Sequence, residues 1–401
     1  VVEHDEEIMR SADYIIDMGP GAGTFGGDVV FQGPIKQLES ARTITSDYLN
    51  GERSLPSYRL RKSTDKITVV GARGNNLQNV TVDFPLRSLV AVTGVSGSGK
   101  STLVSEILYP AMKRHLGLGG DAPAEFDSLE GDIDTIKEIE YVDQNPIGKS
   151  SRSNPVTYIK AFDEIRAIFA AEALAKNRGY KPAFFSFNVP GGRCENCEGE
   201  GSVTIEMQFM ADIKLECDVC KGKRYKDEIL EVTYEGKNIS EVLDMTVDEA
   251  IIFFSTGTKS IHKRLVDKLT PLKDVGLGYV GLGQSSSTLS GGEAQRIKLA
   301  SFLAKGDRQR HTLFIFDEPT TGLHIHDVAK LLESFQALLS QGHSIILVEH
   351  QMDLVARADW VIDLGPGGGK HGGNLMFQGV PSQLTKVTGS STGQFLAEIV
   401  K

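Results

Sequence analysis

The chain has 401 residues, of which 40% are hydrophobic and 24% charged, and its formal net charge at pH 7 is −10. This length has room for two or three domains, and the composition excludes global disorder, collagen and long coiled coils. The apolar runs fall far short of the ~20 residues of a membrane helix, and no secretory signal opens the chain, so we expect a cytoplasmic protein. The excess of acidic residues argues against extensive wrapping of nucleic acid, although the net charge does not exclude binding through a local basic patch.

Taken in chain order, the first feature is a repeat. Residues 1–33 align without a gap with residues 347–379, and both segments contain V-E-H, A-D-x-x-I-D and F-Q-G at the same places. A period this long indicates a duplicated domain and not a solenoid unit. We therefore expect the tail of a first copy in residues 1–55 and a complete second copy after it, with the linker within residues 50–65.

The second copy alternates predicted strands and helices. Apolar runs predict strands at 67–70, 89–92, 139–142, 312–316 and 344–348. Longer segments predict helices at 101–115, 158–175, 292–304 and 326–340. Strands that are apolar throughout and joined by helices indicate a mainly parallel α/β sheet. The expected domains are a first-copy tail at 1–55, the first part of the core of the second copy at 56–150, an insertion at 151–285 and the second part of that core at 286–401.

A phosphate-binding loop follows the predicted strand 89–92. Residues 94–101 match G-x-x-x-x-G-K-[ST] at every fixed position, and Thr102 continues them into a predicted helix. Glycines let the backbone wrap a phosphate, and N–H groups at a helix start point toward it. We expect Lys100 to reach the β- and γ-phosphates and Ser101 to bind Mg²⁺. The predicted nucleotide-binding residues of the loop are Gly94, Ser96, Gly97, Gly99, Lys100, Ser101 and Thr102.

Two acids end the apolar strand at 312–316. Asp317 is placed to hold Mg²⁺, and Glu318 to polarise the attacking water, because phosphoryl transfer depends mostly on positioning and charge. The structural alternative for such a pair, a helix cap or solvated turn, is disfavoured by the preceding phosphate loop and by Pro319.

Four further segments complete a pattern. They are Leu289-Ser-Gly-Gly-Glu293, Gln144 after a strand, Thr321-Gly-Leu-His324 and His350 after the last strand. In this order they resemble the ATP-binding-cassette ATPases, in which two cassettes meet head to tail. The resemblance implies that Ser290, Gly291 and Gly292 cap the γ-phosphate of a partner cassette. It also implies that His350 contacts the γ-phosphate, that Gln144 helps to hold Mg²⁺ and links nucleotide to a neighbouring domain, and that His4 serves the first copy.

The interval from Gly94 to Leu289 is 195 residues, about twice that of a transporter cassette of this class, which indicates a large insertion. All four cysteines of the chain lie in the insertion as two C-x-x-C pairs. This spacing favours a tetrahedral structural Zn²⁺ site, and a reducing compartment would not preserve disulfides. The predicted zinc ligands are Cys194, Cys197, Cys217 and Cys220.

A duplicated cassette with a zinc module before its signature resembles the second half of the UvrA family, the damage-sensing ATPases of the bacterial excinuclease. Agreement extends to Gly71-Ala-Arg-Gly-Asn-Asn-Leu77, Val142-Asp-Gln-Asn-Pro-Ile-Gly148 and Phe185-Ser-Phe-Asn-Val189. The resemblance implies an α/β P-loop ATPase core with an inserted helical and zinc-module signature domain. It further implies ATP, Mg²⁺ and Zn²⁺, damaged duplex DNA as a partner, and homodimerisation. Other implied contacts are the first cassette half and, through that half, a UvrB-type helicase.

Contact with DNA would come from the zinc module and from a hairpin within residues 198–216. Basic residues at the edges of the module would contact phosphates without sequence preference and with strong salt dependence. Several acids in the hairpin count against phosphate contact there, and the plainer interpretation of the basic residues is a solvated face. The candidate DNA-contacting residues are Lys149, Arg152, Arg193, Lys221, Lys223 and Arg224.

Three other functions compete with this interpretation. A paralogue of the same family that confers drug resistance is the alternative nearest to repair, and the feature that separates the two lies in the first half. A chaperone of the DnaJ type shares C-x-x-C-x-G-x-G at residues 194–201, but the chain has no H-P-D tripeptide. A transporter ATPase would lack both the insertion and the cysteine set.

Overall fold

The computed structural model describes residues 1–23, 26–38, 40–148, 150, 152–205, 207, 213–304 and 310–399. The chain divides into two compact units. The first unit consists of Val1–Pro20, Asp28–Gln144 and Lys305–Lys401, and the second of Gly21–Gly27 and Asn145–Ala304.

The second unit is longer than the insertion expected at 151–285. Residues 286–304, which the sequence assigns to the ATP-binding core, group with the insertion instead. The reason is that α12 (Gly291–Leu303) packs against α11 (Ser260–Asp274) of that unit.

A six-stranded sheet forms the centre of the first unit, in the order β15, β14, β5, β13, β12 and β7. All neighbouring strands are parallel except β14 and β15, which are antiparallel. The strands β13 and β5 are buried along almost their whole length, as expected of parallel strands covered on both faces. The bounds are β5 Leu89–Gly94, β7 Glu138–Val142, β12 Thr312–Asp317, β13 Ser344–Val348, β14 Trp360–Gly365 and β15 Asn374–Gly379.

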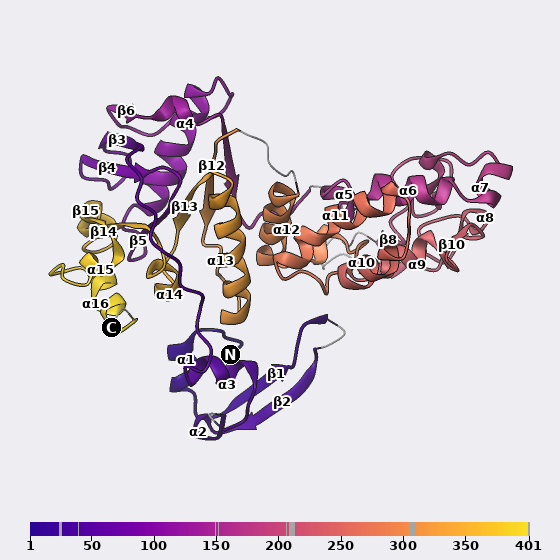
Figure 1. Cartoon of the computed structure of the whole chain (residues 1–401), viewed down its shortest axis with the longest axis horizontal. Helices are drawn as coiled ribbons and strands as arrows, with labels where there is room; N and C mark the ends of the chain where they lie inside the picture. The colour runs from indigo at the N-terminus through magenta and orange to yellow at the C-terminus, as the bar shows by residue number, and fades with distance from the viewer. Residues whose placement is uncertain are drawn as a thin grey trace. The chain divides into compact units, whose positions relative to one another are not determined.

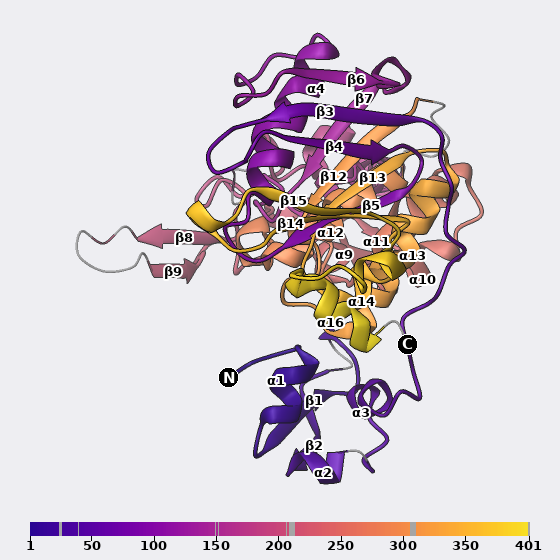
Figure 2. The same cartoon turned by 90° about the vertical axis from the view of Figure 1, so that its left-hand side faces the viewer.

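A smaller antiparallel sheet packs on the large one. Its order is β4, β3, β6, and Figure 2 shows β3 and β4 crossing beside the strands of the larger sheet. Side chains of both sheets and of the helix after the phosphate loop share one core cluster, which holds that helix in place. On the large sheet, α13 (Ile325–Ser340) lies against β12 and β13 (Figure 1). The ring centroids of Phe316 in β12 and Phe335 in α13 are 4.8 Å apart. The strands are β3 Lys66–Ala72, β4 Val80–Pro85 and β6 Ser128–Gly131.

The helices of the first unit match the predicted segments in the second copy. The predicted helix 101–115 is a π-helical run, Thr102–Leu108, continued by α4. Residues 50–65 form neither helix nor strand. The helical segments are α1 Glu6–Ser11, α2 Ile35–Leu38, α3 Ile44–Leu49, η2 Thr102–Leu108, α4 Tyr109–His115, η3 Ile133–Thr135, α13 Ile325–Ser340, α14 Met352–Val355, η6 Gly369–His371, α15 Pro381–Leu384 and α16 Ser391–Ile399.

The sequence repeat is also a structural repeat. The strands β1 (Ile15–Gly19) and β2 (Asp28–Gly33) form an antiparallel hairpin whose register shifts after Asp17. The hairpin of β14 and β15 has the same pairing and shifts after Asp363, the residue aligned with Asp17. Two segments of the chain therefore fold in the same way, down to the position of one bulge.

The second unit is mostly helical. The segment 158–175, predicted as one helix, is divided among three short helices, because the left-handed backbone of Lys160, with φ of 58°, follows the first of them. Its elements are α5 Pro155–Tyr158, α6 Phe162–Ala170, α7 Ala173–Asn177, η4 Pro182–Phe185, β8 Ser202–Ile205, β9 Ile213–Glu216, α8 Asp227–Leu230, β10 Thr233–Tyr234, β11 Lys237–Asn238, α9 Ile239–Asp244, α10 Val247–Ser255, α11 Ser260–Asp274, η5 Ser286–Thr288 and α12 Gly291–Leu303. Among all described residues, no helix combines the length and the apolar character needed to cross a membrane.

Candidate nucleotide site and zinc cluster

The phosphate loop follows β5 and turns directly into the π-helical run. A side chain at Gly94, whose φ is +133°, would place its Cβ 2.1 Å from the carbonyl oxygen of Leu364. The carbonyl oxygen of Gly97 accepts a hydrogen bond from Asn76 Nδ2 at 2.9 Å, which fixes the middle of the loop. Ser96 and Gly97 are exposed, so this turn has its backbone open to a ligand.

Lys100 is almost completely buried beneath the loop. Its Nζ donates to the carbonyl oxygens of Gly94 at 2.8 Å and Val95 at 3.0 Å. Burial lowers the pKa of Lys100, and the carboxylates of Glu318, Asp363 and Asp317 oppose that shift. The two carbonyl oxygens therefore hold the amine inside the loop, and phosphate oxygens can replace them as hydrogen-bond acceptors.

The catalytic candidates meet at the carboxyl ends of neighbouring parallel strands. Glu318 follows β12 with a left-handed φ of 45°, a rare conformation for a residue other than glycine. Gln144, after β7, donates through Nε2 to the carbonyl oxygen of Glu318 at 3.1 Å. His350 Nδ1, after β13, lies 3.7 Å from Glu318 Oε1, and both side chains are about half exposed. The Oδ2 atom of Asp317 accepts from the Tyr141 hydroxyl at 2.8 Å.

Glu349 is a site residue that the sequence alone did not reveal. Its side chain is fully buried, and Oε2 accepts from the backbone N–H groups of His350 at 2.7 Å and Gln351 at 3.0 Å. The other oxygen accepts from the backbone N–H of Thr320 at 3.1 Å and from the Thr320 hydroxyl. One carboxylate thus joins the loop after Glu318 to the segment of His350. The V-E-H motif of the repeat contains this glutamate, and the recurrence of the motif was the signal that could have found it.

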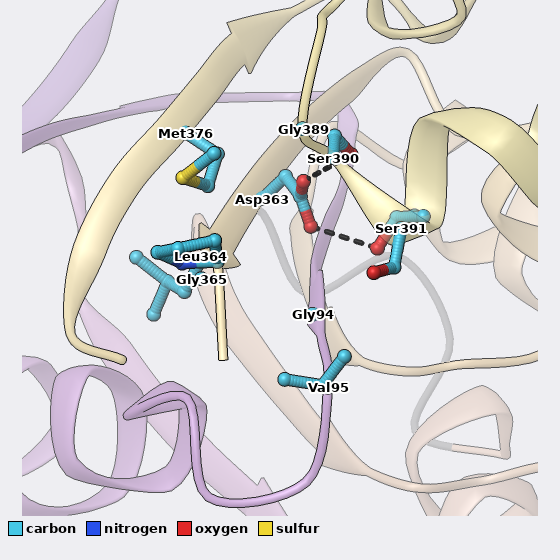
Figure 3. Close-up of a pocket in the computed structure, with 11 residues that line it drawn as sticks. Gly94, Val95, Asp363, Leu364, Gly365, Met376, Gly389, Ser390 and Ser391 are labelled. Carbon is cyan, nitrogen blue, oxygen red and sulfur yellow. Dashed lines mark hydrogen bonds between the residues drawn. The ribbon is translucent and has the colours of Figure 1, made fainter. Parts of the chain in front are cut away.

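Asp363 is a second residue missed from the sequence, although A-D-x-x-I-D of the repeat marks it. It lines a narrow pocket beside Gly94, where it accepts a hydrogen bond from Ser390 Oγ at 2.6 Å (Figure 3). A second hydrogen bond comes from Thr392 Oγ1 at 2.8 Å. Burial raises the pKa of Asp363, while the two hydroxyl donors and the charge of Lys100 act against that rise. The carboxylate therefore balances the buried Lys100 from the side of β14.

The signature segment starts α12 in the second unit. Ser290 is the N-cap: its Oγ accepts from the backbone N–H of Glu293 at 3.3 Å, and its own N–H donates to Glu293 Oε2 at 2.8 Å. Ser290 is exposed, and Gly291 and Gly292 form the first turn of the helix. This 13-residue helix therefore presents its N-terminus as an anion-binding group.

The four cysteines converge in one buried cluster. Their Sγ atoms lie within 4.8 Å of one another, with Cys194 and Cys217 3.9 Å apart and Cys197 and Cys220 3.6 Å apart. Four thiolates at the ~2.3 Å Zn–S distance of a tetrahedral site would be separated by about these lengths. Although burial raises thiol pKa values, N–H donors from the backbone and from Asn196 lower the pKa of Cys217 to about 6. The donor set fits Zn²⁺.

The cluster is framed by the predicted hairpin and by paired charges. The strands β8 and β9 form the antiparallel hairpin, with Val203 opposite Leu215. Arg193 is only 11% exposed and pairs with Glu195 at 3.3 Å and Glu198 at 3.7 Å. The Arg152 side chain pairs with Glu198 at 3.1 Å and Glu200 at 3.6 Å.

The remaining DNA candidates differ in exposure. Lys221 and Lys223 are exposed, while the guanidinium of Arg224 lies 5.4 Å from the ring centroid of Phe187. Lys149 lies outside the described residues. Two of the six candidates are therefore exposed lysines, and the three arginines are engaged within the module.

Comparison with known proteins identifies the relatives of this chain. No family model matches the chain. The chain is 52% identical over 402 residues to UvrABC system protein A of Thermus thermophilus and 49% identical over 404 residues to that of Staphylococcus epidermidis. It spans 41% and 42% of the length of these relatives, and the matches cover all of this chain.

A solved structure agrees over the whole fold. The crystal structure of UvrA2 from Deinococcus radiodurans matches 99% of this chain and 47% of its own, with a TM-score of 0.91 and 45% identity. The chain that carries the phosphate loop, the inserted unit and the cysteine cluster is thus 49% to 52% identical to curated proteins that share the name UvrABC system protein A. The chain belongs to the UvrABC system protein A family.

Proposed function

We propose that this chain binds and hydrolyses ATP as part of the DNA-damage-recognition component of nucleotide excision repair. The observation that carries the proposal is the meeting of Lys100, Glu318 and His350 at the carboxyl ends of adjacent parallel strands. In open α/β sheets, ligands bind at these strand ends. The names of the curated relatives support the assignment to the UvrABC system.

Each residue has one role in the proposed reaction. Lys100 exchanges its two carbonyl acceptors for β- and γ-phosphate oxygens, and Glu318 orients the attacking water. His350 stands beside Glu318, where it contacts the γ-phosphate. Ser101, Asp317 and Gln144 would hold Mg²⁺, which neutralises phosphate charge when bound. The remaining loop residues, Gly94, Ser96, Gly97, Gly99 and Thr102, shape the phosphate cradle.

The signature acts on another cassette in this proposal. The exposed start of α12, with Ser290, Gly291 and Gly292, would close a nucleotide held by a cassette facing it. The facing cassette would be the first cassette half, and two full-length chains would form a homodimer.

The second unit would provide the contact with DNA. Zn²⁺ on the four cysteines would fix the fold of the module, and Lys221 and Lys223 would contact backbone phosphates of damaged duplex DNA. A UvrB-type helicase would join through the first half, and the assembly would act in the cytoplasm. Because phosphate contacts are insensitive to base sequence, this contact would select no particular sequence around a lesion.

Two substitutions test ATP hydrolysis. Lys100→Ala should abolish binding of a fluorescent ATP analogue, because it removes the cation beneath the loop. Glu318→Gln should keep binding and lower turnover at least about 100-fold, as expected for loss of the group that orients the water. The lysine Lys137, which is exposed and lies before β7, is the matched control for the charge change.

The results separate the two roles. Unchanged binding by Lys100→Ala would contradict the phosphate site, and unchanged turnover by Glu318→Gln would remove Glu318 as the catalytic residue. Lys137→Ala should change neither quantity.

A further inference from the structure

Residues of the two copies meet at His324, a contact that the nucleotide site described above does not use. Thr45, in α3 of the first-copy tail, has its Oγ1 3.2 Å from Nε2 of His324. The same hydroxyl donates to Oδ1 of Asp17 at 3.0 Å, and Thr45 is buried. The three side chains form one hydrogen-bonded row from the second copy into the first.

The hydrogen bond that Nδ1 of His324 accepts decides which atoms donate along this row. His324 is the N-cap of α13, and its Nδ1 accepts from the backbone N–H of His326 at 3.2 Å. A neutral imidazole with an accepting Nδ1 carries its proton on Nε2. His324 therefore donates to Thr45, which leaves the hydroxyl proton of Thr45 for Asp17.

The surroundings favour this neutral form. Burial lowers the pKa of His324, as do the charges of His4 and His326, while Asp327 and Asp17 oppose the shift. The rings of His4 and Tyr48 lie edge-on to the imidazole, with centroids 6.4 and 6.2 Å away. The first-copy tail thus contacts the imidazole from two separate segments, the one around His4 and α3.

A short hydrogen-bonded turn of the backbone connects His324 to Glu318, the proposed catalytic residue. It ends the turn that begins at Glu318, where the N–H of Thr321 donates to the carbonyl oxygen of Glu318 at 3.2 Å and that of Leu323 to Thr320 at 3.0 Å. These bonds make the turn one short unit, so a shift of His324 moves the backbone that carries Glu318.

Asp17, the last residue of the row, has a counterpart in the second copy, Asp363. Thr392 donates to Asp363 as Thr45 donates to Asp17, and Asp17 aligns with Asp363 in the repeat. Asp363 faces Lys100 of the phosphate loop. Asp17 therefore occupies the position that, in the second copy, lies beside the phosphate loop of the same cassette.

We propose that His324 is a positioning residue for ATP hydrolysis, and that it holds the Glu318 turn through Thr45 and Asp17 of the first copy. The proposal rests on the proposed ATPase function. In this arrangement the first-copy tail completes the second nucleotide site without touching nucleotide.

Substitutions of Thr45 test the row most directly. Thr45→Val keeps the shape but removes both hydrogen bonds, and loss of bonds of this kind should lower kcat about 3- to 10-fold. The KM for ATP should stay within about twofold, because Thr45 lies outside the phosphate loop. Thr45→Ser retains the hydroxyl and should restore turnover, which a merely structural role of the methyl group would not allow.

A double-mutant cycle identifies the partner. His324→Asn keeps a side chain able to cap α13 but too short to reach Thr45, so it should resemble Thr45→Val in kcat. The double variant should be no slower than either single variant, since both remove one row. Additive losses, or equal losses in the Val and Ser variants, would overturn the proposal.

A measurement without ATP makes the test independent of activity. The ¹⁵N spectrum of the imidazole resonances, with His324 assigned by its loss in His324→Asn, should show the proton on Nε2. A proton on Nδ1 overturns the row whatever the turnover. Absence of both ATP-analogue binding and turnover in the unchanged chain would contradict the proposed function, whereas normal turnover in Thr45→Val would contradict only the role of His324.

Discussion

At the scale of single residues, the site depends on buried charges that are fully hydrogen-bonded. Glu349 is enclosed completely and receives four donors from three residues on two segments. A buried carboxylate is costly unless its oxygens are satisfied, and here the donors are the backbone groups that position Thr320 and His350. The same acid that is stabilised by the fold therefore orders the loop after Glu318 and the segment that contains His350.

Replacement of Glu349 tests this role. In Glu349→Gln the amide NH₂ faces N–H donors, so we expect the free energy of unfolding to fall by about 1–3 kcal/mol, together with a lower kcat. Urea unfolding and steady-state ATP hydrolysis measure the two effects. Glu333→Gln, on the solvated side of α13, is the matched control. Full stability and turnover in Glu349→Gln would show that the loops are ordered by other contacts.

At the scale of elements, the cluster of four cysteines connects distant pieces of backbone. The N–H of Cys194 donates to the carbonyl oxygen of Arg224 at 2.8 Å, and the N–H of Cys217 to that of Gly201 at 2.9 Å. These bonds join the two C-x-x-C turns on either side of β8 and β9. A metal on the four thiolates would hold both turns at once, as structural zinc sites do.

Loss of one ligand should release the two turns. Cys217→Ser is expected to reduce bound zinc from about one equivalent to nearly none, and to lower the thermal unfolding midpoint. Binding of the ATP analogue should persist, because the phosphate loop belongs to the other compact unit. Ser202→Ala in β8 serves as the control. Elemental analysis that finds zinc retained in Cys217→Ser would contradict the four-cysteine site.

At the scale of the whole molecule, the net charge of −10 does not show that basic residues differ locally, some being paired with acids and others exposed. Near the zinc cluster, Arg193 and Arg152 are neutralised by glutamates, while Lys221 and Lys223 are exposed. Only charges that reach a phosphate release counterions, so the exposed lysines should dominate the electrostatic part of binding.

The two lysines make the DNA prediction specific. Replacing both Lys221 and Lys223 by Ala should weaken binding of a duplex and reduce the slope of log K against log salt by about 2. The exposed pair Lys237 and Lys263, in other elements of the same unit, is the control. Fluorescence anisotropy at two or more salt concentrations measures the slope. An unchanged slope in the Lys221 and Lys223 variant would remove these residues from the contact.

The sequence by itself determined the features that are local or repeated. A phosphate loop is a run of eight residues, a buried parallel strand is an apolar run, and two C-x-x-C pairs carry their own ligand spacing. The repeat predicted the likeness of the two hairpins, β1 with β2 and β14 with β15, because aligned residues fold alike. Each of these patterns depends on neighbours along the chain, which is why they could be predicted.

Only the tertiary structure decided which side chains meet across the fold. Nothing local to Arg152 shows that Glu198 and Glu200 neutralise it, and nothing near Glu349 shows that Thr320 is its partner. The row from His324 to Thr45 joins residues 279 positions apart. Such contacts arise when strands and helices pack, and packing depends on the whole set of buried surfaces, not on any one segment.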